Sequence, residues 1–179
     1  MLTLNLETDR LKLRPFKIDD ATRVQELAGN SEVAETTLGI PHPYPIEAAK
    51  NWINHQPVLI ENGTFPLAIV LKDDGVLIGT MTIRVDKEHR KGELAYWVGK
   101  DYWGKGYATE AAKEVVRFGF EVLSLHRIWA KAMSRNPTST RVMQKVGMRK
   151  EGTLKQDIFK SETYEDVDIY GIIKSDYRS

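Results

Sequence analysis

A glycine-rich turn directly before a helical pattern is the segment of this 179-residue chain best suited to chemistry. The turn is Gly104-Lys105-Gly106; an apolar, strand-like segment ends before it at Val98, and a helical repeat begins at Ala108. Backbone N–H groups in such a turn, with a helix N-terminus behind them, form an anion site. Glycine suits this turn because a side chain would keep a phosphate away from the backbone. The turn predicts a phosphate or pyrophosphate ligand, although a plain strand-to-helix connection has the same residues.

Three phosphate-binding patterns can be compared with this turn. The P-loop pattern, G-x-x-x-x-G-K-[ST], starts at Gly99 but fails at Gly106, where a magnesium-binding hydroxyl is required. The dinucleotide pattern, G-x-G-x-x-G/A, fails at Thr109. The pyrophosphate loop of the GNAT acetyltransferases, [QR]-x-x-G-x-[GA], is satisfied at Gly106 and Ala108, while Trp103 stands where Gln or Arg is usual.

Over nearly its whole length the chain resembles the RimJ/RimL-type branch of the GNAT superfamily of N-acetyltransferases. The segments that carry the resemblance are ETDRLKLRPF, LIGTMTI, AYWVGKDYWGKGYATEA, RNPTST and RVMQKVGMRKEG. An aromatic residue before Gly-Lys-Gly is common in this branch, so Trp103 counts little against the match. The resemblance implies an enzyme that moves an acetyl group from acetyl-CoA, its co-substrate, to an amine.

The resemblance also implies how acetyl-CoA binds. The main-chain amides of residues 103–109 cradle its pyrophosphate, and the strand end at Trp97 and Val98 splays from its neighbour to pair with the pantetheine arm. The N–H of Val98 then polarises the thioester carbonyl. Lys105 either adds positive charge or is a solvated loop residue. The implied cofactor contacts are Trp97, Val98, Trp103, Gly104, Lys105, Gly106, Tyr107, Ala108, Thr109 and Asn136.

The segment Asn136-Pro137-Thr138-Ser139 has two interpretations. As local structure, Asn136 is a good helix N-cap and Pro137 a good first helical residue. The resemblance implies instead that Asn136 binds the pantetheine arm and that Ser139 gives a proton to the departing thiolate. A thiol with a pKa of about 8.5 leaves without a strong acid. Many GNAT enzymes use a tyrosine for this step, which makes Tyr102 and Tyr107 alternatives.

The acceptor amine must lose a proton before it can attack, and a carboxylate acting through water is the expected base. Glu93 is the first candidate, and Glu35, Asp166 and Asp168 stay open. Each of these carboxylates also fits an ordinary surface or ion-paired position. Because the chain has no cysteine, it has no thiol to form an acetyl-enzyme, and direct attack in a ternary complex is expected.

Composition narrows the class of protein. The 26 Lys and Arg residues nearly balance 25 Asp and Glu residues, which gives no general electrostatic reason to bind nucleic acid or an acidic membrane. The absence of cysteine excludes disulfides, and the four histidines lack the spacing of a metal site. No apolar run reaches the roughly 20 residues of a membrane span, and the N-terminus does not resemble a signal peptide. We therefore expect a cytoplasmic protein with no metal, and leave a homo-oligomer open.

Hydrophobic periodicity predicts the elements that position these residues. Three prolines make residues 36–45 a loop, and three consecutive strands form an antiparallel meander. The aromatic residues Tyr96, Trp97, Tyr102, Trp103 and Trp129 are assigned to core packing. Strands are predicted over residues 10–14, 65–71, 76–85, 93–98, 127–133, 148–156 and 164–173, and helices over 19–29, from 45, over 108–122 and over 136–147. The order predicts a single α+β domain over residues 1–179, with a mixed, mostly antiparallel GNAT-like sheet of about seven strands flanked by about four helices.

The acceptor amine has several candidates. The RimJ/RimL resemblance implies the α-amine of a protein N-terminus, with a ribosomal protein as the first candidate partner. A polyamine, an amino acid and an aminoglycoside amine stay open, because similar domains act on all of these. A CoA-binding module without catalytic activity is the alternative of another class.

Overall fold

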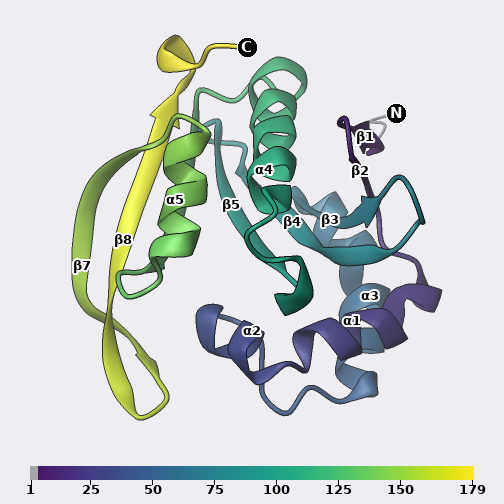
Figure 1. The fold of residues 1–179 in the computed structure, drawn as a ribbon. Helices are drawn as coiled ribbons and strands as arrows, with labels where there is room; N and C mark the ends of the chain where they lie inside the picture. The colour runs from purple at the N-terminus through teal and green to yellow at the C-terminus, as the bar shows by residue number, and fades with distance from the viewer. Residues whose placement is uncertain (1–3) are drawn as a thin grey trace.

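The computed structural model describes residues 4–179 and contains one mixed sheet of eight strands (Figure 1). The strands are β1 Leu6–Glu7, β2 Leu11–Arg14, β3 Thr64–Leu71, β4 Leu77–Asp86, β5 Lys91–Val98, β6 Arg127–Met133, β7 Arg149–Lys160 and β8 Thr163–Ile173. Their order in the sheet is β1-β2-β3-β4-β5-β6-β8-β7. The pair β5 and β6 is parallel, and the other neighbouring pairs are antiparallel. The predicted α+β class and the mostly antiparallel sheet are confirmed.

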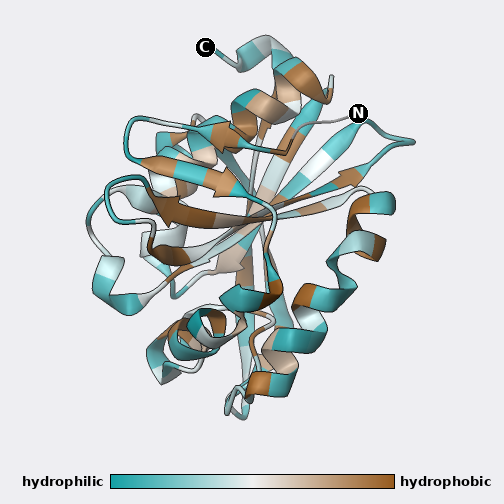
Figure 2. Ribbon diagram, turned by 90° about the vertical axis from the view of Figure 1, so that its right-hand side faces the viewer, coloured by the Kyte–Doolittle hydropathy of each residue, from teal (hydrophilic) through white to brown (hydrophobic). Residues whose placement is uncertain are grey.

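Helices cover both faces of this sheet (Figures 1 and 2). They are α1 Ala21–Ala28, α2 Ser31–Thr36, α3 Ile46–Glu61, α4 Tyr107–Arg117 and α5 Pro137–Lys145. Short 3₁₀ turns cover Ile18–Asp20, Lys100–Tyr102 and Lys174–Asp176, and a π-helical turn covers Phe118–Val122. Helices α4 and α5 pack on one face, while α1 and α3 pack on the other. Figure 2 shows hydrophobic residues along the central strands and on the inner sides of the helices.

Burial on both faces explains the central strands. Along β3, Leu67 and Ile69 contact the core under α4, whereas Ala68 and Val70 contact the core under α1. A strand covered on both sides needs apolar residues at every position, which accounts for the nearly continuous apolar sequence of β3. The meander β3-β4-β5 follows, as predicted.

Two short elements were absent from the sequence prediction, β1 and α2. Strand β1 has only two residues, too few to show a period. Helix α2 begins after Asn30, directly beyond residue 29, where the first helix was predicted to end. In the structure the Asn30 side chain accepts hydrogen bonds from the amides of Glu32 and Val33, so this residue starts the next helix. Asparagine favours both positions, and local sequence does not separate them.

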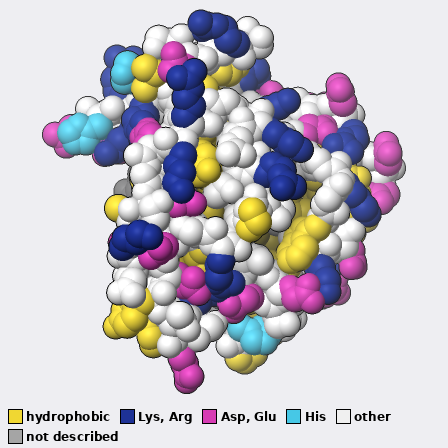
Figure 3. All heavy atoms as spheres, turned by 60° about the vertical axis from the view of Figure 1, so that its left-hand side comes forward, with side chains coloured by type: hydrophobic (Ala, Val, Ile, Leu, Met, Phe, Trp, Pro, Cys, Tyr) yellow, Lys and Arg dark blue, Asp and Glu magenta, His cyan; other side chains and the backbone are white. Residues whose placement is uncertain are grey.

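Charges of both signs are mixed over the molecular surface. Figure 3 shows Lys and Arg side chains interspersed with Asp and Glu on the face that it draws. This face therefore has no extended field of one sign. Within residues 4–179, no helix has the length and apolar character needed to cross a bilayer.

A polar clamp joins the turn between β1 and β2 to the first turn of α4. The Glu110 carboxylate accepts hydrogen bonds from the Thr8 hydroxyl, from the Arg10 amide at 2.9 Å and from Arg10 Nε at 2.7 Å. Burial acts to raise the pKa of Glu110, but these hydrogen bonds from Thr8 and Arg10 hold its pKa below the ordinary 4.5. The clamp therefore stabilises the fold through the ionised carboxylate.

This clamp predicts an acid-dependent loss of stability. Because the folded-state pKa of Glu110 is depressed, its contribution is present above about pH 4.5 and is lost as the pH falls through the folded pKa. Glu110→Gln should lower the free energy of unfolding by about 1–2 kcal/mol at pH 7, and the difference from wild type should shrink toward pH 3. Urea denaturation between pH 3 and pH 7 measures both effects. Glu61→Gln, at an exposed position, is the control, and a difference that does not vary with pH would contradict the assignment.

Candidate active site

A gap opens in the sheet where β5 and β6 stop pairing. These parallel strands pair from Lys91 with Arg127 to Leu94 with Ala130, and no further. Strand β5 nevertheless continues to Val98 along β4, and β6 continues to Met133 along β8. The two strands therefore splay, and residues 95–98 present one edge without a strand partner.

Alternation along β5 determines which main-chain groups face this gap. The Gly99 amide donates to the Ile78 carbonyl at 2.8 Å, so this pair is hydrogen-bonded across β4 and β5. In an antiparallel ladder the main-chain groups of the next residue point to the opposite side. The N–H of Val98 therefore faces the gap, whereas the main-chain groups of Trp97 face β4. This direction fits the predicted oxyanion role of Val98, which stays a prediction.

The glycine turn follows the end of β5 and exposes a row of main-chain amides. Gly104 and Gly106 have φ of +72° and +81°, a backbone conformation that side chains disfavour. The Trp103 amide donates to the Lys100 carbonyl at 3.1 Å, and the Glu110 amide to the Gly106 carbonyl at 3.0 Å. Within residues 4–179, the amides of residues 104–109 have no hydrogen-bond acceptor in the protein. They can hold an anion at the N-terminus of α4.

Trp103 closes this loop onto the end of β5. Its indole Nε1–H donates to the Val98 carbonyl at 2.7 Å. The hydrogen bond gives a structural reason for tryptophan at the position where the loop pattern usually has Gln or Arg. The Lys105 Nζ lies 5.6 Å from the centroid of the Tyr102 ring, and the Lys105 carbonyl accepts from Arg10.

Arg10, in the turn between β1 and β2, contacts the glycine turn, and no sequence motif pointed to this contact. Its Nη1 donates to the Lys105 carbonyl at 3.0 Å, and its guanidinium lies 4.5 Å from the centroid of the Tyr107 ring. The same side chain belongs to the clamp on Glu110. Arg10 therefore brings positive charge beside the exposed amides. It lies almost 100 residues away in the sequence, so only the fold places it there.

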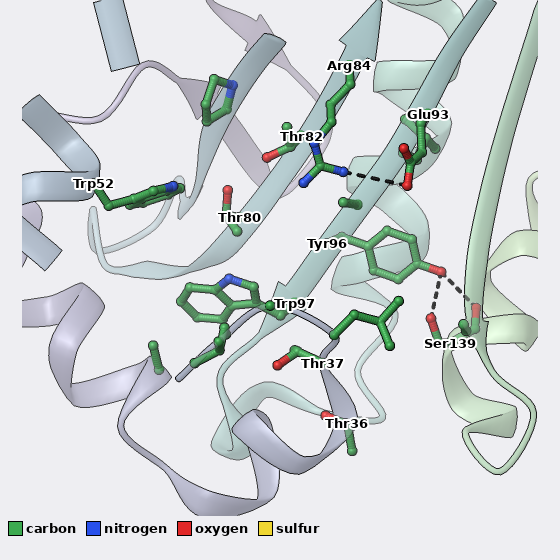
Figure 4. Close-up of a pocket in the computed structure, with 18 of the residues that line it drawn as sticks. Thr36, Thr37, Trp52, Thr80, Thr82, Arg84, Glu93, Tyr96, Trp97 and Ser139 are labelled. Carbon is green, nitrogen blue, oxygen red and sulfur yellow. Dashed lines mark hydrogen bonds and ion pairs between the residues drawn. The ribbon is translucent and has the colours of Figure 1, made fainter. Parts of the chain in front are cut away.

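A cavity of about 790 Å³ passes through the gap and is lined from both faces of the sheet (Figure 4). The Trp97 side chain packs with α1 and α3, while Tyr96 points to the opposite side, toward α5. Trp52 of α3 forms another part of the wall. The loop that follows α2 also contributes, through residues 36–41 and Tyr44. A cavity of this size accommodates a drug-sized ligand or a few amino-acid residues.

Glu93 is the one carboxylate that lines this cavity in the described chain. It lies on β5 on the same side as Trp97, and its side chain is 20% exposed. Arg84 on the neighbouring strand pairs with it loosely, since Arg84 Nη1 lies 3.6 Å from the Glu93 carboxylate (Figure 4). The predicted base therefore has the access to the cavity that its role requires.

Ser139 lies on the opposite side of the cavity and is bonded to Tyr96 (Figure 4). The Ser139 hydroxyl donates to the Tyr96 oxygen at 3.1 Å, and the Tyr96 hydroxyl donates to the Ser139 carbonyl at 2.8 Å. Tyr96 packs against the core, as predicted. Its place in the cavity lining and its hydrogen bonds to Ser139 come only from the structure, because alternation along a strand does not reveal a cavity.

Asn136 has the local structural role that its sequence predicts. Its Oδ1 accepts from the Ser139 amide at 3.3 Å, which makes it the N-cap of α5. Its Nδ2 donates to the Thr36 carbonyl at 3.1 Å and so ties α5 to the end of α2. Contact of Asn136 with the pantetheine arm stays a prediction.

The alternative acids and bases lie outside the cavity lining. Hydrogen bonds from Ser161 and Arg135 lower the pKa of Glu35, and Lys155 lowers that of Asp166. Asp168 is buried, which acts to raise its pKa, but Thr153, Lys150 and Ser134 hold the pKa below its ordinary value. Lowered pKa values make these three groups weaker bases. Tyr102 accepts a hydrogen bond from Arg23, and Tyr107 packs under Arg10.

Residues 10–149 match the family described as acetyltransferase (GNAT) domain, and the chain therefore belongs to the GNAT family. Its relative named Uncharacterized N-acetyltransferase YoaA, of Bacillus subtilis (strain 168), is 34% identical over 171 residues, which cover 94% of this chain and 96% of YoaA. The fold, the family and this relative make the chain an acetyl-CoA-dependent N-acetyltransferase.

Other relatives differ in what their names say they act on. Spermidine N(1)-acetyltransferase of Escherichia coli (strain K12) is 27% identical over 157 residues, 87% of this chain and 82% of that protein. A solved structure of RimL, a ribosomal L7/L12 alpha-N-protein acetyltransferase in complex with coenzyme A, has a TM-score of 0.87 at 17% identity. It covers 94% of this chain and 97% of RimL, and this likeness concerns the fold. Acetyl-CoA is the co-substrate in this family.

The loop geometry predicts that Gly106→Glu abolishes acetyl-CoA binding. The new carboxylate would repel a pyrophosphate, and the left-handed backbone would cost about 1–2 kcal/mol of stability. Gly75→Glu is a matched control, because Gly75 has φ of +73°, open space around it and a position in the β3–β4 turn. Calorimetry should show a similar stability loss for both variants but lost affinity for Gly106→Glu alone. Unchanged affinity in Gly106→Glu would exclude the loop as the anion site.

Proposed function

We propose that the protein acetylates the α-amine of a protein N-terminus by direct attack in a ternary complex, as a RimJ/RimL-type member of its family. The observation that carries the proposal is the cavity in the β5–β6 gap. It is lined by Tyr96 and Ser139 on the side of the sheet covered by α4 and α5, and by the Glu93 carboxylate and Trp97 on the other side. A cofactor held on the α4 side and an amine entering from the α1–α3 side would meet in this gap.

In the proposed reaction each group has one role. The amides of residues 104–109 and Arg10 hold the pyrophosphate, and the free edge of β5 pairs with the pantetheine arm. Glu93, acting through water, takes a proton from the acceptor amine. The amine nitrogen then attacks the thioester carbon, and the Val98 N–H stabilises the developing oxyanion. The C–N bond forms, the C–S bond breaks, and the thiolate leaves beside Ser139. The nitrogen, positively charged after the attack, loses its second proton to water and leaves a neutral amide.

The charges of the cavity support a monoamine as the acceptor. Its charged lining residues are Glu93, Arg84 and Lys131, which is one carboxylate against two cations. A polyamine would bring further positive charges into a cavity that already has a positive excess. An α-amine also has a pKa of about 7.7–8.0, against about 10.4 for an alkyl amine of the lysine type. Near neutral pH the reactive, unprotonated fraction of the α-amine is therefore several hundred times larger.

A ribosomal protein N-terminus is the first partner to test, on the strength of the resemblance to the RimJ/RimL branch. A polyamine is the second candidate, because the Escherichia coli relative is a spermidine N(1)-acetyltransferase. A polyamine would bind better in a cavity with more negative charge, whereas a monoamine does not need that charge. Mass spectrometry of a cell extract incubated with the protein and acetyl-CoA identifies the acetylated product directly.

Glu93→Gln should lower kcat about 10²- to 10⁴-fold near pH 7, because the amide cannot accept the proton of the amine. The affinity for acetyl-CoA should stay unchanged. Asp166→Asn is the control, since Asp166 lies outside the cavity and pairs with Lys155. Release of CoA thiol, followed at several pH values, measures the effect. Wild-type turnover in Glu93→Gln would remove this residue from the mechanism.

Arg84→Glu should shift acceptor preference toward cations, because it replaces a cavity cation by a second carboxylate. The ratio of kcat/KM for spermidine to that for an N-terminal peptide should rise at least tenfold. Arg90→Glu, in the turn between β4 and β5, makes the same charge change outside the cavity and should leave the ratio unaltered. A wild-type protein that prefers spermidine to every peptide would contradict the α-amine proposal.

A further inference from the structure

Two hydroxyl groups meet at the gap, and they come from different elements. Tyr96 lies on β5 beyond Leu94, where β5 no longer pairs with β6, and Ser139 lies in the first turn of α5. Both hydrogen bonds between these residues are formed, at 3.1 Å from the serine hydroxyl and at 2.8 Å to the serine carbonyl. The pair lines the cavity on the side of the sheet covered by α4 and α5.

The hydrogens of this pair have defined directions. Burial raises the pKa of Tyr96, so the phenol keeps its proton at neutral pH. Because that proton goes to the Ser139 carbonyl, the phenol oxygen is left to accept the Ser139 hydroxyl. Tyr96 therefore holds the serine side chain in one rotamer. Tyr96 itself is fixed by a main-chain atom of α5, so the position of Ser139 depends on both elements.

We propose that Tyr96 is a positioning residue for Ser139, and that the two hydroxyls act as one unit to stabilise the thiolate released by acetyl transfer. This inference rests on the proposed function, because it needs the sulfur of CoA to lie at the gap. It adds a residue to the reaction and gives the serine a partner.

The two hydroxyls stabilise the thiolate by rotating their O–H bonds, and neither transfers its proton. When the C–S bond breaks, the sulfur keeps the electron pair, and the Ser139 hydroxyl turns from Tyr96 toward it. The Tyr96 hydroxyl then turns from the Ser139 carbonyl to the serine oxygen. The result is a chain from Tyr96 through Ser139 to sulfur, in which each donor strengthens the next. The thiolate takes its proton from solvent when CoA leaves.

The pKa values of the groups favour this series of hydrogen bonds over proton donation by either hydroxyl. A thiol has a pKa of about 8.5, below the ordinary pKa of about 10 for tyrosine. Burial raises the pKa of Tyr96 further. A phenol so much less acidic than the thiol would leave the proton on oxygen at equilibrium, so hydrogen bonding is the stabilisation that the pair can supply.

The experiment measures the pKa of the CoA thiol bound to the enzyme and needs no acceptor. Far-ultraviolet absorbance of the thiolate is titrated for wild type, Tyr96→Phe, Ser139→Ala and the double variant, each saturated with CoA. Each single variant should raise the thiol pKa by about one unit, a tenfold change in ionisation. The double variant should match Ser139→Ala, because Tyr96 acts through the serine.

Tyr170→Phe is the control, since it removes a phenol hydroxyl from a buried residue outside the cavity. It should leave the thiol pKa unchanged. A Tyr96→Phe protein that loses stability but binds CoA with the wild-type thiol pKa would overturn the inference alone. Additive effects in the double variant would also overturn it. A wild-type protein that fails to bind CoA would overturn the proposed function, and the inference with it.

Discussion

The loss of hydrogen bonding between two parallel strands is the constraint on which the rest of the site depends. Strands β5 and β6 pair over four residues and separate after Leu94 and Ala130. Unpaired main-chain groups inside a protein are costly unless something else satisfies them. The exposed edge of β5 is tolerable because the cavity keeps it accessible. It can serve as a template for an extended ligand, as a sheet edge does for a peptide.

Side chains along β5 point alternately to the two faces of the sheet, so the residues proposed for the reaction lie on both faces. Glu93 and Trp97 point to the face of α1 and α3, and Tyr96 points to Ser139 on the face of α5. In a closed sheet these residues would never share a cavity, because the backbone would separate them. The gap removes that barrier, so the groups proposed for the amine and for the thiolate line one cavity from opposite sides.

The glycine turn that is proposed to bind the anion depends on contacts from elsewhere in the chain. Its glycines supply the backbone conformation, and the start of α4 supplies unpaired amides. The Arg10 side chain donates to the Lys105 carbonyl and to the Glu110 carboxylate, so the turn between β1 and β2 helps to hold the glycine turn in place. A preorganised loop loses less entropy when an anion binds, which is a general route to affinity.

The sequence by itself determined the fold class, most of the elements and the glycine loop. Periods of two and 3.6 residues are local signals, and the positive φ of Gly104 and Gly106 follows from a turn that the sequence already indicates. Its resemblance to acetyltransferases pointed to the family. Only the tertiary structure decided that Glu93 alone among the candidate carboxylates lines the cavity, that Arg10 reaches the loop, and that Tyr96 is bonded to Ser139. These contacts join residues that are far apart in the sequence. Hydrophobic periodicity is a local signal, and it does not indicate where two strands stop pairing.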